Sequence, residues 1–112
     1  MNDCVIYLIC RGRTTNDDLP WPMLLGRRLD ARLTITDRLQ SMAQAMHQRN
    51  LHTIYTSPSP RAMATARLIM KGCDDANLRI TAALAAVDYG RWEGLTWREV
   101  MANDAETYAQ HL

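Results

Sequence analysis

The chain has 112 residues, 47% of them hydrophobic, and a formal net charge of +1. This length predicts a single domain over residues 1–112 with a modest core. The near-neutral charge gives no reason to expect nucleic acid or an anionic membrane as a partner, and no apolar stretch approaches the ~20 residues that a bilayer span needs.

The first predicted element is a strand over residues 4–10, because CVIYLIC is an unbroken apolar run rich in β-branched residues. A run of this kind is typical of a strand that is buried on both faces. Residues 13–33 contain two prolines, a glycine and several charges, which predict a long loop. A helix is then expected after Thr36, which is a good N-cap residue, with a stop near Asn50.

A second strand is expected over residues 52–56, followed directly by a helix. Ser59 can cap this helix, Pro60 suits its first position and Gly72 is expected to end it. Residues 78–81 predict a third strand. The alternation of strands and helices predicts an α/β fold with a largely parallel sheet.

The last predicted helix begins with a capping box formed by Thr96 and Glu99. No glycine or other helix-stop signal follows before Leu112, so we expect the chain to end inside a longer domain. The three cysteines have neither paired spacing nor the spacing of zinc ligands. This pattern favours a reduced, cytoplasmic location.

Two loops could hold an anion, since ligands of parallel α/β sheets gather where strands end and helices begin. One is the turn at residues 11–14, and the other is the segment 57–65, where Arg61 and Thr65 lie one helical turn apart. Free amides at a helix start and a planar guanidinium both favour phosphate. The alternative is that these arginines are solvated surface charges, and the residues alone do not decide between the two.

Four sequence blocks occur in a characteristic order: CRGRT at 10–14, GRRLDARLT at 26–34, TSPSPRAMATA at 56–66 and LAAVDYGRWEGLT at 84–96. Together they resemble the histidine phosphatase superfamily, also called phosphoglycerate mutase-like, and the last block is closer to its phosphatase branch. The resemblance covers roughly residues 4–100. It implies a three-layer α/β fold with a largely parallel sheet and flanking helices, of which this chain would form the N-terminal half.

The resemblance also implies that the catalytic residues are replaced. In the family a histidine attacks phosphorus and a glutamate protonates the leaving group, and the aligned residues here are Arg11 and Ala86. A guanidinium offers only donors and a methyl group has no proton to give. The family's second pocket histidine belongs to a later strand that the chain does not reach. We therefore expect a catalytically degenerate phosphatase.

The pocket that remains is expected to bind phosphate or a small phosphorylated ligand, without a metal or other cofactor. Asp17, at the position of a family asparagine, would repel such an anion. The resemblance leaves Gly12, Thr14, Ser57 and Arg61 as phosphate-binding residues. Arg11 is added to them, because Cys10 stands where the family has an arginine and the charge of Arg11 replaces the one that is lost.

Two alternatives stay open. The chain could be an active phosphomonoester hydrolase that uses Cys10, which lies beside two arginines, or one completed by a second polypeptide. It could also be a non-enzymatic interaction remnant. Buried structural roles are favoured for Cys10 and Cys73. Because the family inserts a later strand between the first two strands of its chain, unpaired strand edges here predict a homo-oligomer or a loosely packed monomer.

Overall fold

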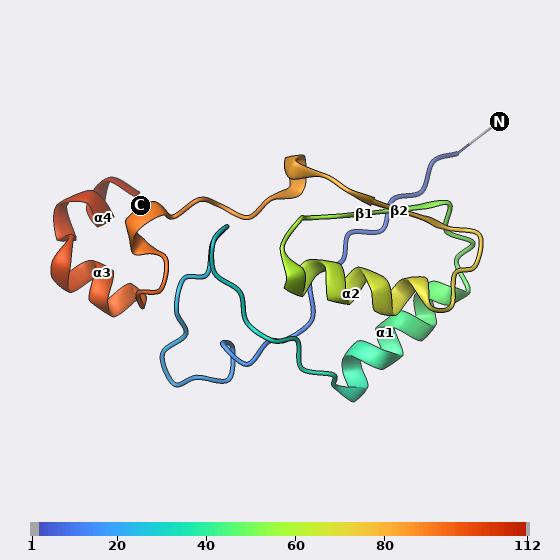
Figure 1. Ribbon diagram of the computed structural model, residues 1–112, viewed down its shortest axis with the longest axis horizontal. Helices are drawn as coiled ribbons and strands as arrows, with labels where there is room; N and C mark the ends of the chain where they lie inside the picture. Colours follow the sequence, from blue (N-terminus) through green and yellow to red (C-terminus); the bar gives the residue numbers. More distant parts are fainter. Residues whose placement is uncertain (1–2, 112) are drawn as a thin grey trace.

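The structure is a computed structural model, and it describes residues 3–111. The molecule is elongated, with extents of 52 × 32 × 20 Å, and its secondary structure is concentrated at the two ends of the long axis (Figure 1). One end holds α1 (Asp37–His47), β1 (Thr53–Thr56), α2 (Pro60–Met70) and β2 (Asn77–Ile80), and the other holds α3 (Trp97–Asn103) and α4 (Ala105–His111). Long loops join the two ends, with short 3-10 helices at Ala82–Leu84 and Gly90–Trp92.

The β1–α2–β2 unit confirms the predicted parallel α/β organisation. β1 and β2 pair in parallel, with Thr53 opposite Asn77 and Thr56 opposite Ile80. The helix between them begins at Pro60, as predicted, but the side chain of Ser59 makes no capping hydrogen bond. It ends at Met70, two residues before the glycine that was expected to end it.

Gly72 has a different role from the predicted helix stop. A side chain at this position would overlap the ring of His47 on α1. The glycine therefore permits the close approach of the turn after α2 to the end of α1.

The main core lies between α1, α2 and the turn before β2. Ala43 of α1, Ile69 of α2 and Cys73 are buried together, and Ile54 of β1 packs against them. Met42 and Met46 complete the contact from α1. Both helices lie on the same side of the sheet (Figure 1), and Tyr55 of β1 is 61% exposed.

The prediction of a buried strand over residues 4–10 is wrong. The structure assigns this segment no secondary structure, and Ile6 and Leu8 are 76% and 94% exposed. A strand exists only through hydrogen bonds to a neighbouring strand, and within residues 3–111 the sheet contains only β1 and β2. The sheet is therefore smaller than expected, although its class and its parallel pairing are confirmed.

The predicted helix starts are confirmed where a local cap exists. Thr36 is extended, and its hydroxyl accepts a hydrogen bond from the Leu39 amide at 3.1 Å. Thr96 and Glu99 form the predicted capping box at the start of α3. The second helix of this end, α4, follows after Asp104 and was not separately predicted.

Candidate functional site

Arg11 and Ala86, which are far apart in the sequence, line the same cleft of about 270 Å³. Arg61 at the first turn of α2 and Asp17 of the long loop line it as well. The two positions at which the resemblance implies a nucleophile and an acid therefore share one surface. An arginine and a methyl group stand there.

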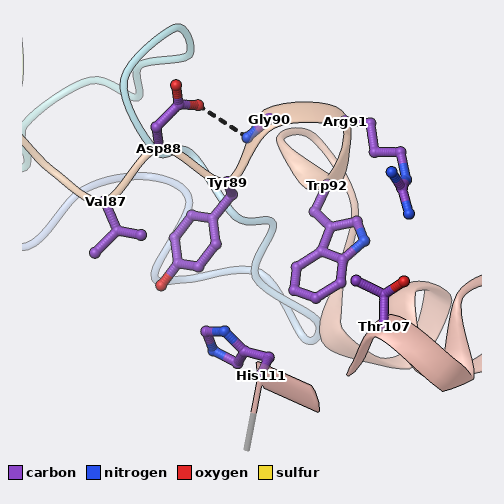
Figure 2. Close-up of a pocket in the computed structure, with 8 residues that line it drawn as sticks. All are labelled: Val87, Asp88, Tyr89, Gly90, Arg91, Trp92, Thr107 and His111. Carbon is purple, nitrogen blue, oxygen red and sulfur yellow. Dashed lines mark hydrogen bonds between the residues drawn. The ribbon is translucent and has the colours of Figure 1, made fainter. Parts of the chain in front are cut away.

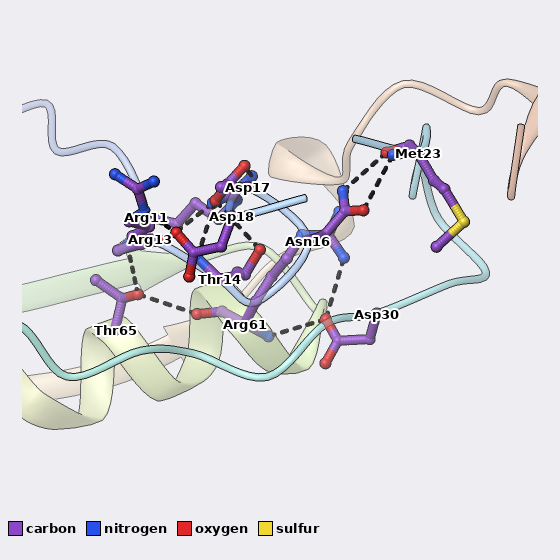
Figure 3. A network of polar contacts seen from close by, with 11 residues as sticks. Arg11, Arg13, Thr14, Asn16, Asp17, Asp18, Met23, Asp30, Arg61 and Thr65 are labelled. Atoms are coloured by element: carbon purple, nitrogen blue, oxygen red, sulfur yellow. Dashed lines mark hydrogen bonds and ion pairs between the residues drawn. The ribbon is translucent and has the colours of Figure 1, made fainter. Parts of the chain in front are cut away.

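Arg11 is held by Asp17 at the edge of this cleft (Figure 3). Its Nη1 donates to Asp17 Oδ2 at 2.7 Å and to the Gly12 carbonyl at 2.9 Å. Asp17 Oδ2 also accepts from the Thr14 amide at 2.8 Å and from the Thr14 hydroxyl at 3.1 Å. The hydrogen bond from Arg11, followed by that from the Thr14 amide, lowers the pKa of Asp17 from its ordinary 3.8 to about 2. Asp17 is therefore a carboxylate at neutral pH and neutralises Arg11.

Arg61 is buried and anchors the 26–30 loop to the start of α2. Its Nη1 donates to the Leu29 carbonyl at 3.0 Å and to Asp30 Oδ1 at 3.1 Å, and its Nη2 donates to the Gly26 carbonyl at 2.9 Å. Asp30 Oδ1 also accepts from the Arg61 amide at 3.3 Å. An internal carboxylate thus occupies the helix start, where the sequence predicted a bound anion.

Thr65, one turn along α2, fixes the first loop to the helix (Figure 3). The Gly12 amide donates to the Thr65 hydroxyl at 3.0 Å, and this hydroxyl donates to the Arg61 carbonyl at 3.0 Å. Gly12 is buried, and a Cβ there would lie 2.7 Å from the Leu33 side chain. The glycine is needed because the loop lies so close to its neighbours.

The five residues expected to bind phosphate therefore separate into two groups. Arg11 and Arg61 line the cleft. Gly12 and Thr14 are buried and position the loop. Ser57 is not among the lining residues. Its hydroxyl lies 3.0 Å from the Ser59 hydroxyl and accepts from the Ser59 amide at 3.1 Å.

Sequence reasoning missed a second ion-pair cluster beside the site. The Glu93 side chain is 4% exposed and accepts from the Arg28 amide at 2.9 Å, while the Arg28 guanidinium bonds to both Glu93 and Asp88. The arginine and its two carboxylates come from two of the blocks that carried the resemblance, GRRLD and DYGRWEG. The signal was a charged residue of each sign in two blocks that the fold brings together.

A larger hollow of about 360 Å³ lies next to this cleft and shares Val87 and Tyr89 with it (Figure 2). Aromatic rings of Tyr89, Trp92 and His111 dominate it. Its one arginine, Arg91, is paired with Asp104. The candidate site is placed in the smaller cleft, which contains two arginines and both predicted catalytic positions.

The cysteines do not form a second nucleophile site. Cys10 is exposed, which contradicts the expected buried role, and it is not among the residues that line the cleft. Cys73 is buried in the core, as expected. Within the described residues no group of three or more His, Cys, Asp or Glu side chains could hold a metal ion. None of the helices in this part of the chain has the length and apolarity to cross a membrane.

The parallel β–α–β unit, with a cleft beside the start of its helix, defines the chain as an α/β protein. The family model described as histidine phosphatase superfamily (branch 1) matches residues 6–112, and the chain therefore belongs to this family. The predicted family is confirmed. No curated protein matches the chain in sequence.

Solved structures of phosphatases share the fold. A mycobacterial glucosyl-3-phosphoglycerate phosphatase is 22% identical with a TM-score of 0.73, over 89% of this chain and 46% of its own. The same enzyme solved with VO3 gives 22% and 0.70, over 88% of this chain and 47% of its own. A putative alpha-ribazole-5'-P phosphatase from Escherichia coli K-12 is 26% identical with a TM-score of 0.72, over 88% of this chain and 49% of its own. The chain thus spans about half the length of these structures.

Proposed function

We propose that the chain is a non-hydrolysing member of the histidine phosphatase superfamily that binds phosphate or a small phosphoester in the cleft of Arg11. The observation that carries this proposal is that Arg11, Ala86 and Arg61 line one cleft. The cleft offers guanidinium donors to an anion. It offers no group at the two expected catalytic positions that could complete the family reaction.

The chemistry of the two replaced positions supports the absence of turnover. A protonated guanidinium has no lone pair with which to attack phosphorus, so Arg11 cannot form a covalent phospho-intermediate. Ala86 cannot protonate a leaving alkoxide. Loss of the nucleophile alone in a covalent hydrolase lowers turnover by about a millionfold.

The electrostatics of the cleft support weak binding. Arg11 is paired with Asp17, so an incoming phosphate must compete with a carboxylate for the same donors. Arg61 already donates to three oxygen acceptors. Arg11 is therefore the side chain that can exchange its partner, because it is at the edge of the cleft and its side chain is 35% exposed.

The test is an amide NMR titration of the purified chain with inorganic phosphate and with orthovanadate. Vanadate is chosen because a phosphatase of the same fold has been solved with VO3. We expect shifts at the cleft residues Arg11, Gly26 and Ala86, and we expect Arg11→Gln to weaken binding at least fivefold. The matched control is Arg13→Gln, because Arg13 is an exposed arginine of the same loop that pairs with Asp18 and does not line the cleft.

Hydrolysis is measured in parallel with p-nitrophenyl phosphate at high protein concentration. We expect no turnover above that of the buffer. Turnover that disappears in Cys10→Ala would contradict the proposal and favour the cysteine route. Absence of shifts with both anions would contradict phosphate binding and favour an interaction remnant without a ligand.

A further inference from the structure

Residues 4–10 form an exposed apolar segment that is not paired with the sheet. Val5, Ile6 and Leu8 are 68%, 76% and 94% exposed, and Tyr7 and Ile9 are each more than one third exposed. The segment CVIYLIC contains no charge, glycine or proline. Such a run, with strong β propensity and free backbone groups, is a template for pairing with another strand.

The total surface of the chain shows that a large area lacks cover. The accessible surface is 8215 Å² for 12.8 kDa. A compact monomer of that mass exposes about 6,300 Å², so the excess is about 1,900 Å². The radius of gyration of 16.7 Å likewise exceeds the ~13 Å expected for a compact chain of this length. A specific interface buries about 800 Å² on each partner, which is less than this excess over the whole chain.

We propose that residues 4–10 pair antiparallel with the same segment of a second copy, about a two-fold axis at Tyr7. This arrangement is self-complementary. It sets Ile6 of each copy opposite Leu8 of the other, so both copies use the same surface. The charges that flank the segment select its direction. Antiparallel pairing sets Asp3 opposite the partner's Arg11, which also pairs with Asp17 of its own chain, whereas parallel pairing in register would oppose like charges.

The register has a chemical signature in the two exposed cysteines. Pairing centred on Tyr7 sets Cys4 opposite the partner's Cys10, and both thiols are exposed in the single chain. Directly opposed residues of antiparallel strands have Cα atoms about 4.5 to 5.5 Å apart, within the range that a disulfide spans. Diamide can therefore take two electrons and two protons from each thiol pair and leave two Cys4–Cys10 bonds in each dimer.

The experiment combines sedimentation velocity with diamide cross-linking of the full chain. The wild type is expected to be a dimer, and Leu8→Lys is expected to raise its dissociation constant about tenfold or more, since lysine on an edge strand blocks pairing. Because Leu8 is 94% exposed, this change removes no packing from the monomer. Leu84→Lys is the matched control, an equal change at a leucine that is 52% exposed outside the segment.

Peptide mapping of the oxidised dimer tests the register. We expect Cys4–Cys10 linkages that are lost in Cys4→Ser and also in Cys10→Ser. A Cys4–Cys4 linkage would overturn the antiparallel register. A wild type that stays monomeric at millimolar concentration, one that forms larger open assemblies, or a dimer that survives Leu8→Lys would overturn the proposed interface.

Discussion

Replacing Asp17 by asparagine should weaken folding and strengthen phosphate binding at the same time. The pKa of Asp17 is lowered from 3.8 to about 2, chiefly by the hydrogen bond from Arg11. A shift of this size corresponds to about 2.5 kcal/mol of folding free energy for a fully protected group. Because the Asp17 side chain is 34% exposed, solvent screening reduces the expected loss in Asp17→Asn to about 1 kcal/mol at neutral pH.

Phosphate binding should change in the opposite direction. Asp17→Asn keeps an acceptor for the Thr14 amide but removes the negative charge that competes for Arg11. Removing one like charge beside an exposed anion site is worth about 1 kcal/mol, which tightens the dissociation constant about fivefold. Urea unfolding and the phosphate titration measure the two effects on the same preparation.

The contribution of Asp17 to folding stability should depend on pH. A carboxylate with a lowered folded-state pKa stabilises the fold above the unfolded value of 3.8, and this contribution disappears as the pH falls through 3.8 towards 2. The stability difference between wild type and Asp17→Asn should therefore narrow over that range. Asp18→Asn is the control, because Asp18 and Arg13 are both exposed and their pair should contribute less than ~0.5 kcal/mol. An Asp17→Asn variant with unchanged stability, or with weaker phosphate binding, would refute this reasoning.

Other substitutions test the structural roles assigned above. Arg61→Met should lower the free energy of unfolding in urea by about 3 kcal/mol, since it leaves two backbone carbonyls without their donor and Asp30 without its ion-pair partner; a loss below ~1 kcal/mol would show that the anchor is unimportant. Thr96→Ala should lower it by about 1 kcal/mol through loss of the cap, while Thr96→Ser should retain most of it. Iodoacetamide should modify Cys4 and Cys10 in the native protein but Cys73 only after denaturation, and native labelling of Cys73 by mass spectrometry would contradict its burial.

Helix starts could be predicted from the sequence because their cause is local. The hydroxyl of Thr36 caps an amide three residues later, and Thr96 does the same. The order β1–α2–β2 followed from the same kind of signal. The segment 4–10 could not be placed in this way, because a strand requires a partner and no property of the run itself supplies one. Its composition predicted the ability to pair but not the absence of a neighbour.

The candidate site could be predicted only in part, because some of its contacts depend on how distant segments fold together. Four blocks in a family order placed Arg11 and Ala86 at one site, and the cleft contains both. The partners of the arginines depend on how the long loop folds back, so the roles of Asp17 and Asp30 could not be read from spacing. Arg61 was expected to bind an anion from solution, and the structure gives it an internal one.

Three residues of the first loop, Cys10, Arg11 and Asp17, differ from the family pattern, and their charges balance one another. The resemblance expects a cation at the position of Cys10, and the cation here is one residue later, at Arg11. If the asparagine that the resemblance expects stood at residue 17, Arg11 would line the cleft beside Arg61 with no anion to balance it. Asp17 supplies that charge and also fixes the loop through the Thr14 amide. The ion pair between Arg11 and Asp17 thus helps to fix the loop, and under the proposed function the Asp17 carboxylate would compete with phosphate for Arg11.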